Sequence, residues 1–207
     1  MKKVKKRNAG AKERSSAKPN AIVLAALELF TRYGYRKTSI DDIAQAAQVA
    51  KRTVYLHFEN KAAVFLAILE YLGDQVRQRC VAAERMGGTA ADRLTAFLNA
   101  YFGMAFELFS KSAHMPELEE TFSKLARASI GNLNTEYEAR LARFLRSLEK
   151  TGEIGGPPPG LTVKQLVHIL VRAAEGAKHD PDVKGDRKAF DRRLRELAIL
   201  AIAAVRK

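Results

Sequence analysis

Residues 38–61 read TSIDDIAQAAQVAKRTVYLHFENK, a pattern that predicts a helix, a tight turn and a second helix. Ser39 is a favourable N-cap for the first helix, and Asp42 three positions later completes a capping box. Apolar residues then recur at the spacing of one helix face, which gives this helix a side to bury. These residues are Ile40, Ile43, Ala44 and Ala47. The stretch is therefore expected to fold as a helix-turn-helix unit.

The second helix has only a narrow apolar stripe, formed by Val54 and Phe58. The rest of its surface carries side chains that suit phosphates and base edges better than a protein interior. They are Lys51, Arg52, Thr53, Tyr55 and His57. A helix of this composition indicates a DNA-reading element.

Basic residues stand at two successive helix starts. Lys51 and Arg52 open the second helix, and Lys61 opens the next helix after the expected N-cap Asn60. Cations at a helix N-terminus oppose the macrodipole, at a cost of roughly 0.3 to 1 kcal/mol each. The arrangement suggests an external anion, for which a phosphate backbone is the natural candidate. The alternative is that each lysine is an ordinary solvated residue, but the helix pattern and the basic surface together favour DNA.

The chain resembles the tetracycline-repressor (TetR) family of bacterial transcription regulators over about residues 18–72. Three stretches carry the resemblance: the leading helix at 21–35, the start of the helix-turn-helix at 38–44, and the segment 53–61. The last of these has the aromatic-rich end of the recognition helix followed by Asn-Lys. The resemblance implies an all-α protein, with a three-helix DNA-binding head and a helical body that binds a ligand and dimerises.

Two positions depart from the family pattern. Gln48 stands in the turn where the family usually has Gly, and Ala50 stands where it often has Ser. Gln48 must then adopt any left-handed backbone geometry at a cost that Gly avoids. DNA binding is still expected.

The predicted DNA contacts fall into three groups. Thr53 and His57 are expected near bases, together with the two basic residues that open the helix. Tyr55 and Lys61 are expected to hold phosphates, and the first helix can offer a backbone N–H at its start. The full set is Thr38, Ser39, Lys51, Arg52, Thr53, Tyr55, His57 and Lys61.

Length and composition set the outer limits. A chain of 207 residues can hold one or two domains with a sizeable core, and no strand-like alternation stands out. No apolar run approaches the ~20 residues of a membrane span, and the N-terminus lacks a signal-peptide core. The single Cys80 excludes an internal disulfide framework and fits a reducing cytoplasm. We therefore expect a cytoplasmic, all-helical protein that makes no membrane contact.

The net charge of +13 is concentrated near the N-terminus. Residues 1–60 carry 13 of the 36 Lys and Arg residues but only five of the 23 Asp and Glu residues. Residues 1–17 are basic and almost devoid of apolar side chains, so they are expected to form a disordered arm. The arm is either a solvated tail or a segment that lies along DNA phosphates or in the minor groove.

The predicted domains follow this arm. Residues 18–60 form the DNA-binding head, whose first helix begins near Asn20 and ends at the C-cap Gly34. Residues 61–85 form a brace helix that links the head to the body. Residues 91–207 form the effector-binding and dimerisation domain.

The body begins after Gly87 and Gly88 with a helix at about 91–110 that is apolar on nearly all sides, and such a helix is buried. Its aromatic residues are either plain core or the wall of a pocket; the resemblance implies that the helix is central to a ligand-binding body. An effector is expected to be largely apolar. The candidate ligand-binding residues are Phe97, Tyr101, Met104, Phe106, Glu107, His114, Tyr137, His168 and Arg172.

A Pro- and Gly-rich loop at 152–160 separates two final helices, predicted at about 162–178 and 186–206. Both have an apolar face, which packs either within the chain or against a second copy. The resemblance implies that these helices pair with their copies in a four-helix dimer interface. The candidate interface residues are Leu166, Ile169, Leu170, Ala173, Ala177, Phe190, Leu194, Leu197, Leu200, Ala201 and Ala204.

These expectations favour a homodimeric transcriptional repressor that a small molecule releases from a palindromic operator in double-stranded DNA. The alternative is a DNA-binding dimer without an effector, controlled by a protein partner or acting architecturally. An enzyme is disfavoured, because the sequence has no Gly-rich phosphate loop, no His-Glu-x-x-His, no Gly-x-Ser-x-Gly and no clustered Cys and His ligands. No cofactor and no metal are predicted.

Overall fold

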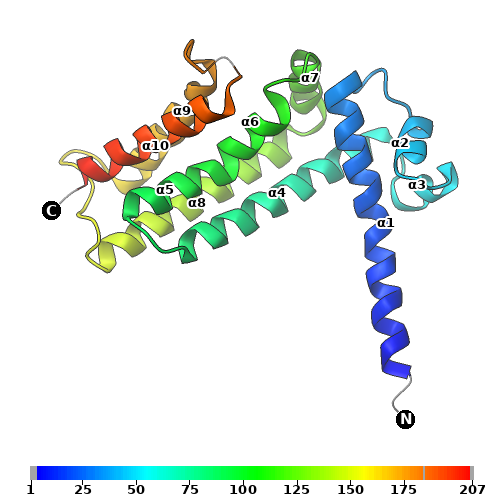
Figure 1. The fold of residues 1–207 in the computed structure, drawn as a ribbon, viewed down its shortest axis with the longest axis horizontal. Helices are drawn as coiled ribbons and strands as arrows, with labels where there is room; N and C mark the ends of the chain where they lie inside the picture. Colours follow the sequence, from blue (N-terminus) through cyan, green and yellow to red (C-terminus); the bar gives the residue numbers. More distant parts are fainter. Residues whose placement is uncertain (1–3, 184, 206–207) are drawn as a thin grey trace. The chain divides into compact units, whose positions relative to one another are not determined.

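The computed structural model describes the backbone of residues 4–183 and 185–205, and within these ranges the side chains from Pro19 onward. Every regular element in this part of the chain is helical, as predicted (Figure 1). The helices form two compact units, and each is described by itself. Within the described residues, no helix combines the length and the apolar character that a membrane span requires.

The first unit contains the chain up to Leu72 together with Ser112–Arg127. Its helices are α1 (Val4–Tyr33), α2 (Ile40–Ala46), α3 (Lys51–His57), the first part of α4 (Lys61–Arg85) and α7 (Met115–Leu125). Helices α2 and α3 pack against α1 and against each other. The centre of the unit is made of buried apolar side chains: Ile22, Ala26, Phe30, Ile43, Val54 and Val64.

Helix α1 starts earlier than predicted. It begins at Val4 rather than near Asn20, so the segment expected to be a disordered arm has a helical backbone from Val4 onward. Residues 1–3 of that arm lie outside the described residues. The segment is rich in Lys, Arg and Ala, which are strong helix formers, and it only has to extend a helix that is already nucleated. The expectation of a disordered arm was based on its lack of apolar side chains and did not take this helix propensity into account.

Helix α7 was expected in the body, and the structure groups it with the first unit instead. It packs against α1, and its Phe122 lies against Phe65 of α4 with ring centroids 5.0 Å apart. Glu117 of α7 accepts a hydrogen bond from the backbone N–H of Arg36 at 2.6 Å. These partners are far apart in the sequence, so local patterns gave no sign of the contact.

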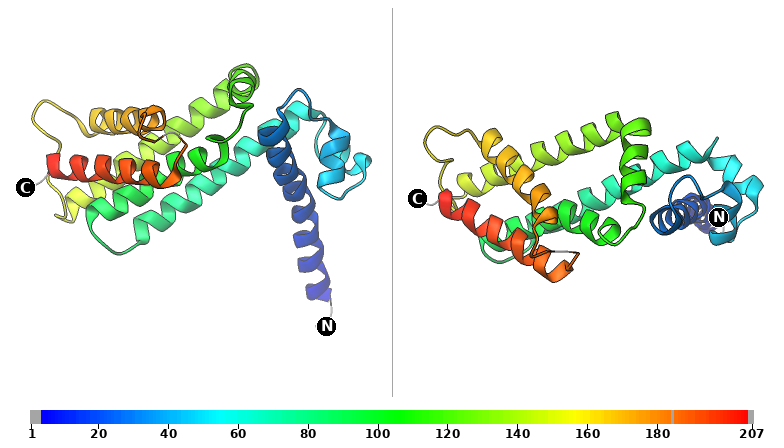
Figure 2. Two further views of the ribbon diagram at one scale, coloured as in Figure 1. Left: turned by 45° about the horizontal axis from the view of Figure 1, so that its top comes forward. Right: turned by 90° about the horizontal axis from the view of Figure 1, so that it is seen from above.

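The second unit contains Gly73–Lys111 and the chain from Ala128 onward. After the last part of α4 come α5 (Ala90–Leu98), a π-helical turn (Asn99–Gly103), α6 (Met104–Phe109), α8 (Arg127–Lys150), α9 (Val163–Gly176), a short 3-10 turn (Ala177–His179) and α10 (Arg187–Ala204). Helix α10 packs along α5 and also contacts α9 (Figure 2).

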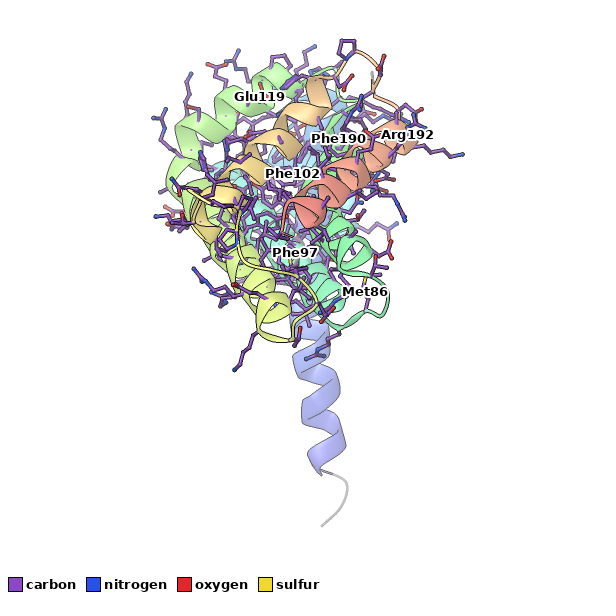
Figure 3. The ribbon with its side chains drawn as sticks, turned by 90° about the vertical axis from the view of Figure 1, so that its left-hand side faces the viewer. Met86, Phe97, Phe102, Glu119, Phe190 and Arg192 are labelled. Carbon is purple, nitrogen blue, oxygen red and sulfur yellow. The ribbon has the colours of Figure 1, made fainter. Side chains whose placement is uncertain are left out.

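Stacked aromatic rings occupy the interior of the second unit. Phe97 stacks on Phe144 with centroids 5.2 Å apart, and Phe106 stacks on Phe190 at 4.2 Å. Figure 3 shows Phe97 and Phe190 among the helices of this unit, and both side chains are buried. Packing in the core therefore explains why residues 91–110 are apolar on nearly all sides.

The predicted helix at 91–110 is interrupted by the π-helical turn Asn99–Gly103, called the π turn below. Arg187 of α10 donates hydrogen bonds to the carbonyl oxygen of Gly103 and, at 3.1 Å, to Oδ1 of Asn99. A Cβ atom on Gly103 would overlap the Asn99 side chain. Any other residue at this position would force the Asn99 and Arg187 side chains to move, and the π turn is bound by a partner in a distant helix.

Candidate functional site

The capping box predicted at the start of α2 is present. The Ser39 hydroxyl accepts a hydrogen bond from the backbone N–H of Asp42 at 3.1 Å, and the Ser39 backbone N–H donates to Asp42 Oδ2 at 2.8 Å. Hydrogen bonds from the Ser39 hydroxyl and then from its N–H lower the pKa of Asp42. Because the Ser39 N–H is already bound, it is not available to a phosphate while the capping box is intact.

The turn between α2 and α3 has the strained geometry expected from its sequence. Gln48 has φ 54°, and it is the one non-glycine residue with positive φ in the part of the chain that the structure describes. The turn is closed by a hydrogen bond from the N–H of Val49 to the carbonyl of Ala44 at 2.9 Å. A left-handed backbone at a residue with a Cβ costs roughly 1–2 kcal/mol. The tight turn of the helix-turn-helix is thus formed without glycine.

Helix α3 is held to the first unit by a small part of its surface. Val54 is completely buried, and Phe58, just beyond the helix end, is half-buried with an extended backbone. The predicted DNA contacts on this helix are largely outside the core: Lys51, Arg52, Tyr55 and His57 are exposed, and Thr53 is half-buried. The helix therefore presents the predicted polar surface.

Leu56 was not among the residues predicted to contact DNA. Its side chain is 78% exposed, the highest value for a large apolar residue in the described part of the chain. Successive residues of a helix are rotated by about 100°, so Arg52 and Leu56 both lie on the side opposite the buried Val54. The sequence did contain a sign of this exposure. Leu56 stands two positions after Val54, and residues two apart lie on opposite sides of a helix, so Leu56 cannot share the buried face with Val54.

Lys61 has a different role from the predicted phosphate clamp. Its Nζ donates hydrogen bonds to the carbonyl oxygens of Tyr35 at 2.7 Å, Thr38 at 2.8 Å and Arg36 at 3.4 Å. It also lies 4.4 Å from the centroid of the Tyr35 ring, and burial lowers the pKa of the ammonium group. An ammonium group has three donors, so none remains for a phosphate. The predicted clamp is corrected to a structural clasp on the α1–α2 connection.

Thr38 also belongs to this connection. Its side chain is buried, and its hydroxyl donates to the carbonyl oxygen of Gly34 at 2.8 Å. Gly34 ends α1 with φ 86°, as its predicted C-cap role requires. The side chain of Thr38 is therefore not a DNA contact, while a contribution from its backbone N–H stays a prediction.

Lys51 remains free to exchange partners. Its Nζ lies 2.8 Å from Asp41 Oδ2, and both side chains are more than half exposed. The hydrogen bond with Asp41 and then its negative charge raise the pKa of Lys51. Exposed ion pairs of this kind contribute little to stability. A phosphate can replace the Asp41 carboxylate at little cost.

The helix-turn-helix region can be compared with known families. Residues 22–68 match the family described as "Bacterial regulatory proteins, tetR family". This part of the chain is a TetR-type helix-turn-helix region. The matched residues include the Gly34 cap, the capping box, the Gln48 turn, α3 and the Lys61 clasp.

Two relatives are transcriptional regulators, one an activator and the other a negative regulator. The chain is 32% identical over 102 residues to the HTH-type transcriptional activator FasR of Mycolicibacterium smegmatis, a match that covers 47% of this chain and 47% of FasR. It is 24% identical over 124 residues to IcaR of Staphylococcus aureus, the negative transcriptional regulator of the biofilm operon icaADBC. That match covers 59% of this chain and 67% of IcaR. The chain thus aligns with about half of the length of FasR, and these relatives are regulators rather than enzymes.

Solved structures of transcriptional regulators share the fold over nearly the whole chain. A TetR regulator from Chloroflexus aurantiacus has a TM-score of 0.70 and 22% identity, covering 94% of this chain and 98% of the other. The fatty acid degradation regulator FadR from Bacillus halodurans has a TM-score of 0.68 and 20% identity, covering 91% of this chain and 96% of the other. The helical body therefore shares its fold with these structures as well.

Three of the nine predicted ligand residues meet at one small cavity. Tyr101, Tyr137 and Arg172 line a space of about 40 Å³ together with Phe102, Asn134, Val171 and Glu175. The Tyr101 hydroxyl contacts Asn134 Oδ1 at 2.5 Å, and the Tyr137 hydroxyl donates to the carbonyl of Phe97 at 3.1 Å. Burial raises the pKa of Tyr101 to about 12. A space of this size suits about one water molecule rather than a drug-sized ligand.

The other predicted ligand residues are not at this cavity. Phe97, Met104 and Phe106 are buried core residues. Glu107 and His168 are exposed on the surface of the second unit, and His114 belongs to the first unit beside Glu117. The sequence pattern could not separate these groups, because core, surface and cavity residues alternate along the same helices.

The predicted dimer residues also divide into two sets. Four are buried within the single chain and are corrected to core residues: Leu170, Ala177, Phe190 and Leu194. The remaining seven keep partial or full exposure: Leu166, Ile169, Ala173, Leu197, Leu200, Ala201 and Ala204. Ile169 is 53% and Leu200 67% exposed. These seven residues of α9 and α10 are called the apolar stripe below.

Two further observations concern possible metal ligands and the single cysteine. No group of three or more His, Cys, Asp or Glu residues is placed to hold a metal ion among the described residues. Cys80 is buried, and burial raises the pKa of its thiol to about 12, which makes it a poor nucleophile.

Proposed function

We propose that the chain is a sequence-specific, homodimeric TetR-family repressor that binds a palindromic operator and is released by a small molecule. The observation that carries this proposal is the surface of α3. Val54 of this helix is buried in the core, whereas Arg52, Leu56 and their neighbours are exposed on the opposite side. This is the arrangement by which a recognition helix enters the major groove. Because its partner is DNA, the protein is proposed to act in the cytoplasm.

Dimerisation is proposed through the apolar stripe. Exposed leucine and isoleucine on two contacting helices, such as Ile169 and Leu200, are costly in water unless a partner covers them. Small residues beside them, such as Ala173 and Ala204, allow helices to approach closely. A second copy would present the same stripe across a two-fold axis. Two copies of α3 would then read half-sites about 34 to 36 Å apart, or a multiple of that distance.

The effector is proposed to enter the second unit at the Tyr101 cavity. The cavity has aromatic and aliphatic walls, and Asn134, Arg172 and Glu175 add polar groups. This lining fits a largely apolar molecule that carries a polar group. The cavity must enlarge to admit it, so the effector would favour a conformation other than the one described. Release from DNA requires only that the two conformations differ in their affinity for the operator.

The direction of regulation is part of the proposal. FasR is named as an activator and IcaR as a negative regulator, so likeness to them supports regulation without choosing its sign. Repression is preferred because a dimer bound to a promoter excludes polymerase without needing any further contact.

A second candidate is an effector-independent DNA-binding dimer, controlled by a protein partner or acting architecturally. The observation in its favour is the small volume of the cavity, about 40 Å³. Extraction of purified protein with an organic solvent separates the two candidates. A bound lipophilic molecule supports the effector, whereas its absence, together with no thermal shift from a panel of apolar molecules, supports the alternative.

The main test is fluorescence anisotropy on a duplex that the protein selects from random DNA, compared with a scrambled duplex across a salt series. Specific binding tighter by ~10³ or more, with two chains per duplex, is expected. Equal affinity for both duplexes, lost together as salt rises, would overturn sequence-specific regulation and leave an architectural binder.

A further inference from the structure

Leu56 occupies the side of α3 that faces away from the core. It is 78% exposed, and Val54 two residues earlier is completely buried. Four residues before Leu56 stands Arg52, so the two side chains are neighbours on one face of the helix. Within the described residues, Arg52 forms no hydrogen bond or ion pair, so its guanidinium is free to meet a partner.

A single exposed leucine on a protein surface usually needs no explanation. Here the setting is different, because its neighbours Arg52, Tyr55 and His57 are exposed and able to form hydrogen bonds. A leucine among them gives up a donor or acceptor at a position that points towards the groove. The leucine can therefore contribute to binding free energy only if the surface that it contacts is itself apolar.

The major groove has one apolar group on its base edges, the 5-methyl group of thymine. We propose that Leu56 is a specificity-determining residue that packs against a thymine methyl group in each half-site. This inference rests on the proposed function of α3 as the recognition helix. It extends that function, because it assigns a base to a residue with no hydrogen-bonding capacity.

The neighbouring arginine predicts where this thymine lies. Arginine reads guanine through O6 and N7. Four residues of helix advance about 6 Å, while stacked base pairs are about 3.4 Å apart. The thymine that Leu56 contacts is therefore expected about two base pairs from the guanine that Arg52 reads.

The test replaces single thymines by deoxyuridine, which lacks only the methyl group, in the duplex selected by the full-length protein. Wild-type protein is expected to lose about fourfold in Kd at one thymine per half-site, from one buried methyl group. The Leu56→Ala variant should bind the thymine and uracil duplexes equally. The Leu56→Met variant, which keeps an apolar side chain, should retain most of the sensitivity.

The matched control is Leu125→Ala, a change at an exposed leucine of α7. It should keep the wild-type response to uracil, and both alanine variants should keep the wild-type unfolding midpoint because neither leucine is buried. If no single thymine is sensitive, or if Leu56→Ala responds like wild type, the assignment is overturned. Failure to recover any preferred duplex would instead overturn the proposed function, and the assignment with it.

Discussion

Two helices of the first unit begin with lysine, and the two lysines are used in opposite ways. At the start of α3, Lys51 is exposed and paired with Asp41, which raises its pKa. At the start of α4, Lys61 is held by carbonyl oxygens of the α1–α2 connection, and burial lowers its pKa. A cation at a helix start is thus not in itself a sign of a phosphate. The decisive question is whether its donors are already bound within the protein.

The largest expected effect tests the clasp. Lys61→Met should lower the free energy of unfolding by about 2–3 kcal/mol, because the carbonyl oxygens of Tyr35 and Thr38 lose a charged donor. Urea denaturation measures this change, with Lys51→Met as the matched control. The control should leave the unfolding midpoint unchanged. Equal midpoints for the two variants would remove the distinction between the lysines.

The next effect concerns sequence choice. Arg52→Ala should weaken binding to the selected operator by about 1–3 kcal/mol while changing the affinity for a scrambled duplex much less, because a bidentate contact with guanine is lost. Fluorescence anisotropy on both duplexes measures the difference. An equal loss on the two duplexes would assign Arg52 to the phosphates, the role proposed for Lys51.

A stabilising change tests the turn between the two helices. Gln48→Gly should raise the free energy of unfolding by about 1 kcal/mol, because glycine adopts the positive φ of this position without a steric cost. Gln45→Gly, in the last turn of α2, is the control and should lower it. A destabilised Gln48→Gly protein would show that the Gln48 side chain contributes more than its backbone strain costs.

The smallest effect separates Lys51 from Arg52. Lys51→Met should weaken binding to all duplexes by a similar factor and reduce the slope of log K against log salt by about one. The slope is measured by anisotropy between low and moderate salt. A change confined to the selected duplex would mean that Lys51 reads bases, and the two neighbouring cations would then share one role.

The features predicted correctly from the sequence are local ones. The capping box at Ser39, the cap at Gly34 and the positive φ of Gln48 each depend on a few neighbouring residues. The same is true of α4, whose limits were predicted at both ends. Helix periodicity also placed Val54 in the core.

The features that were missed depend on partners far away in the chain. The role of Lys61 is set by carbonyl groups more than twenty positions earlier, and the π turn is held by Arg187 of α10. Helix α7 joins the first unit through contacts such as Glu117 with Arg36. Periodicity identifies which residues of a helix are apolar, but it does not say which of several apolar faces meets the core. For that reason four predicted dimer residues proved to be core.

The crowded contact at Gly103 limits how this sequence can vary. A side chain of any size or polarity at position 103 would overlap the carboxamide of Asn99, and the guanidinium of Arg187 lies close behind it. Single substitutions of Gly103 should therefore be rare in functional variants, while paired changes that shorten residue 99 should be accepted. Among diverged copies of this chain, positions 99 and 103 are expected to change together, with position 187 as the third member of the set.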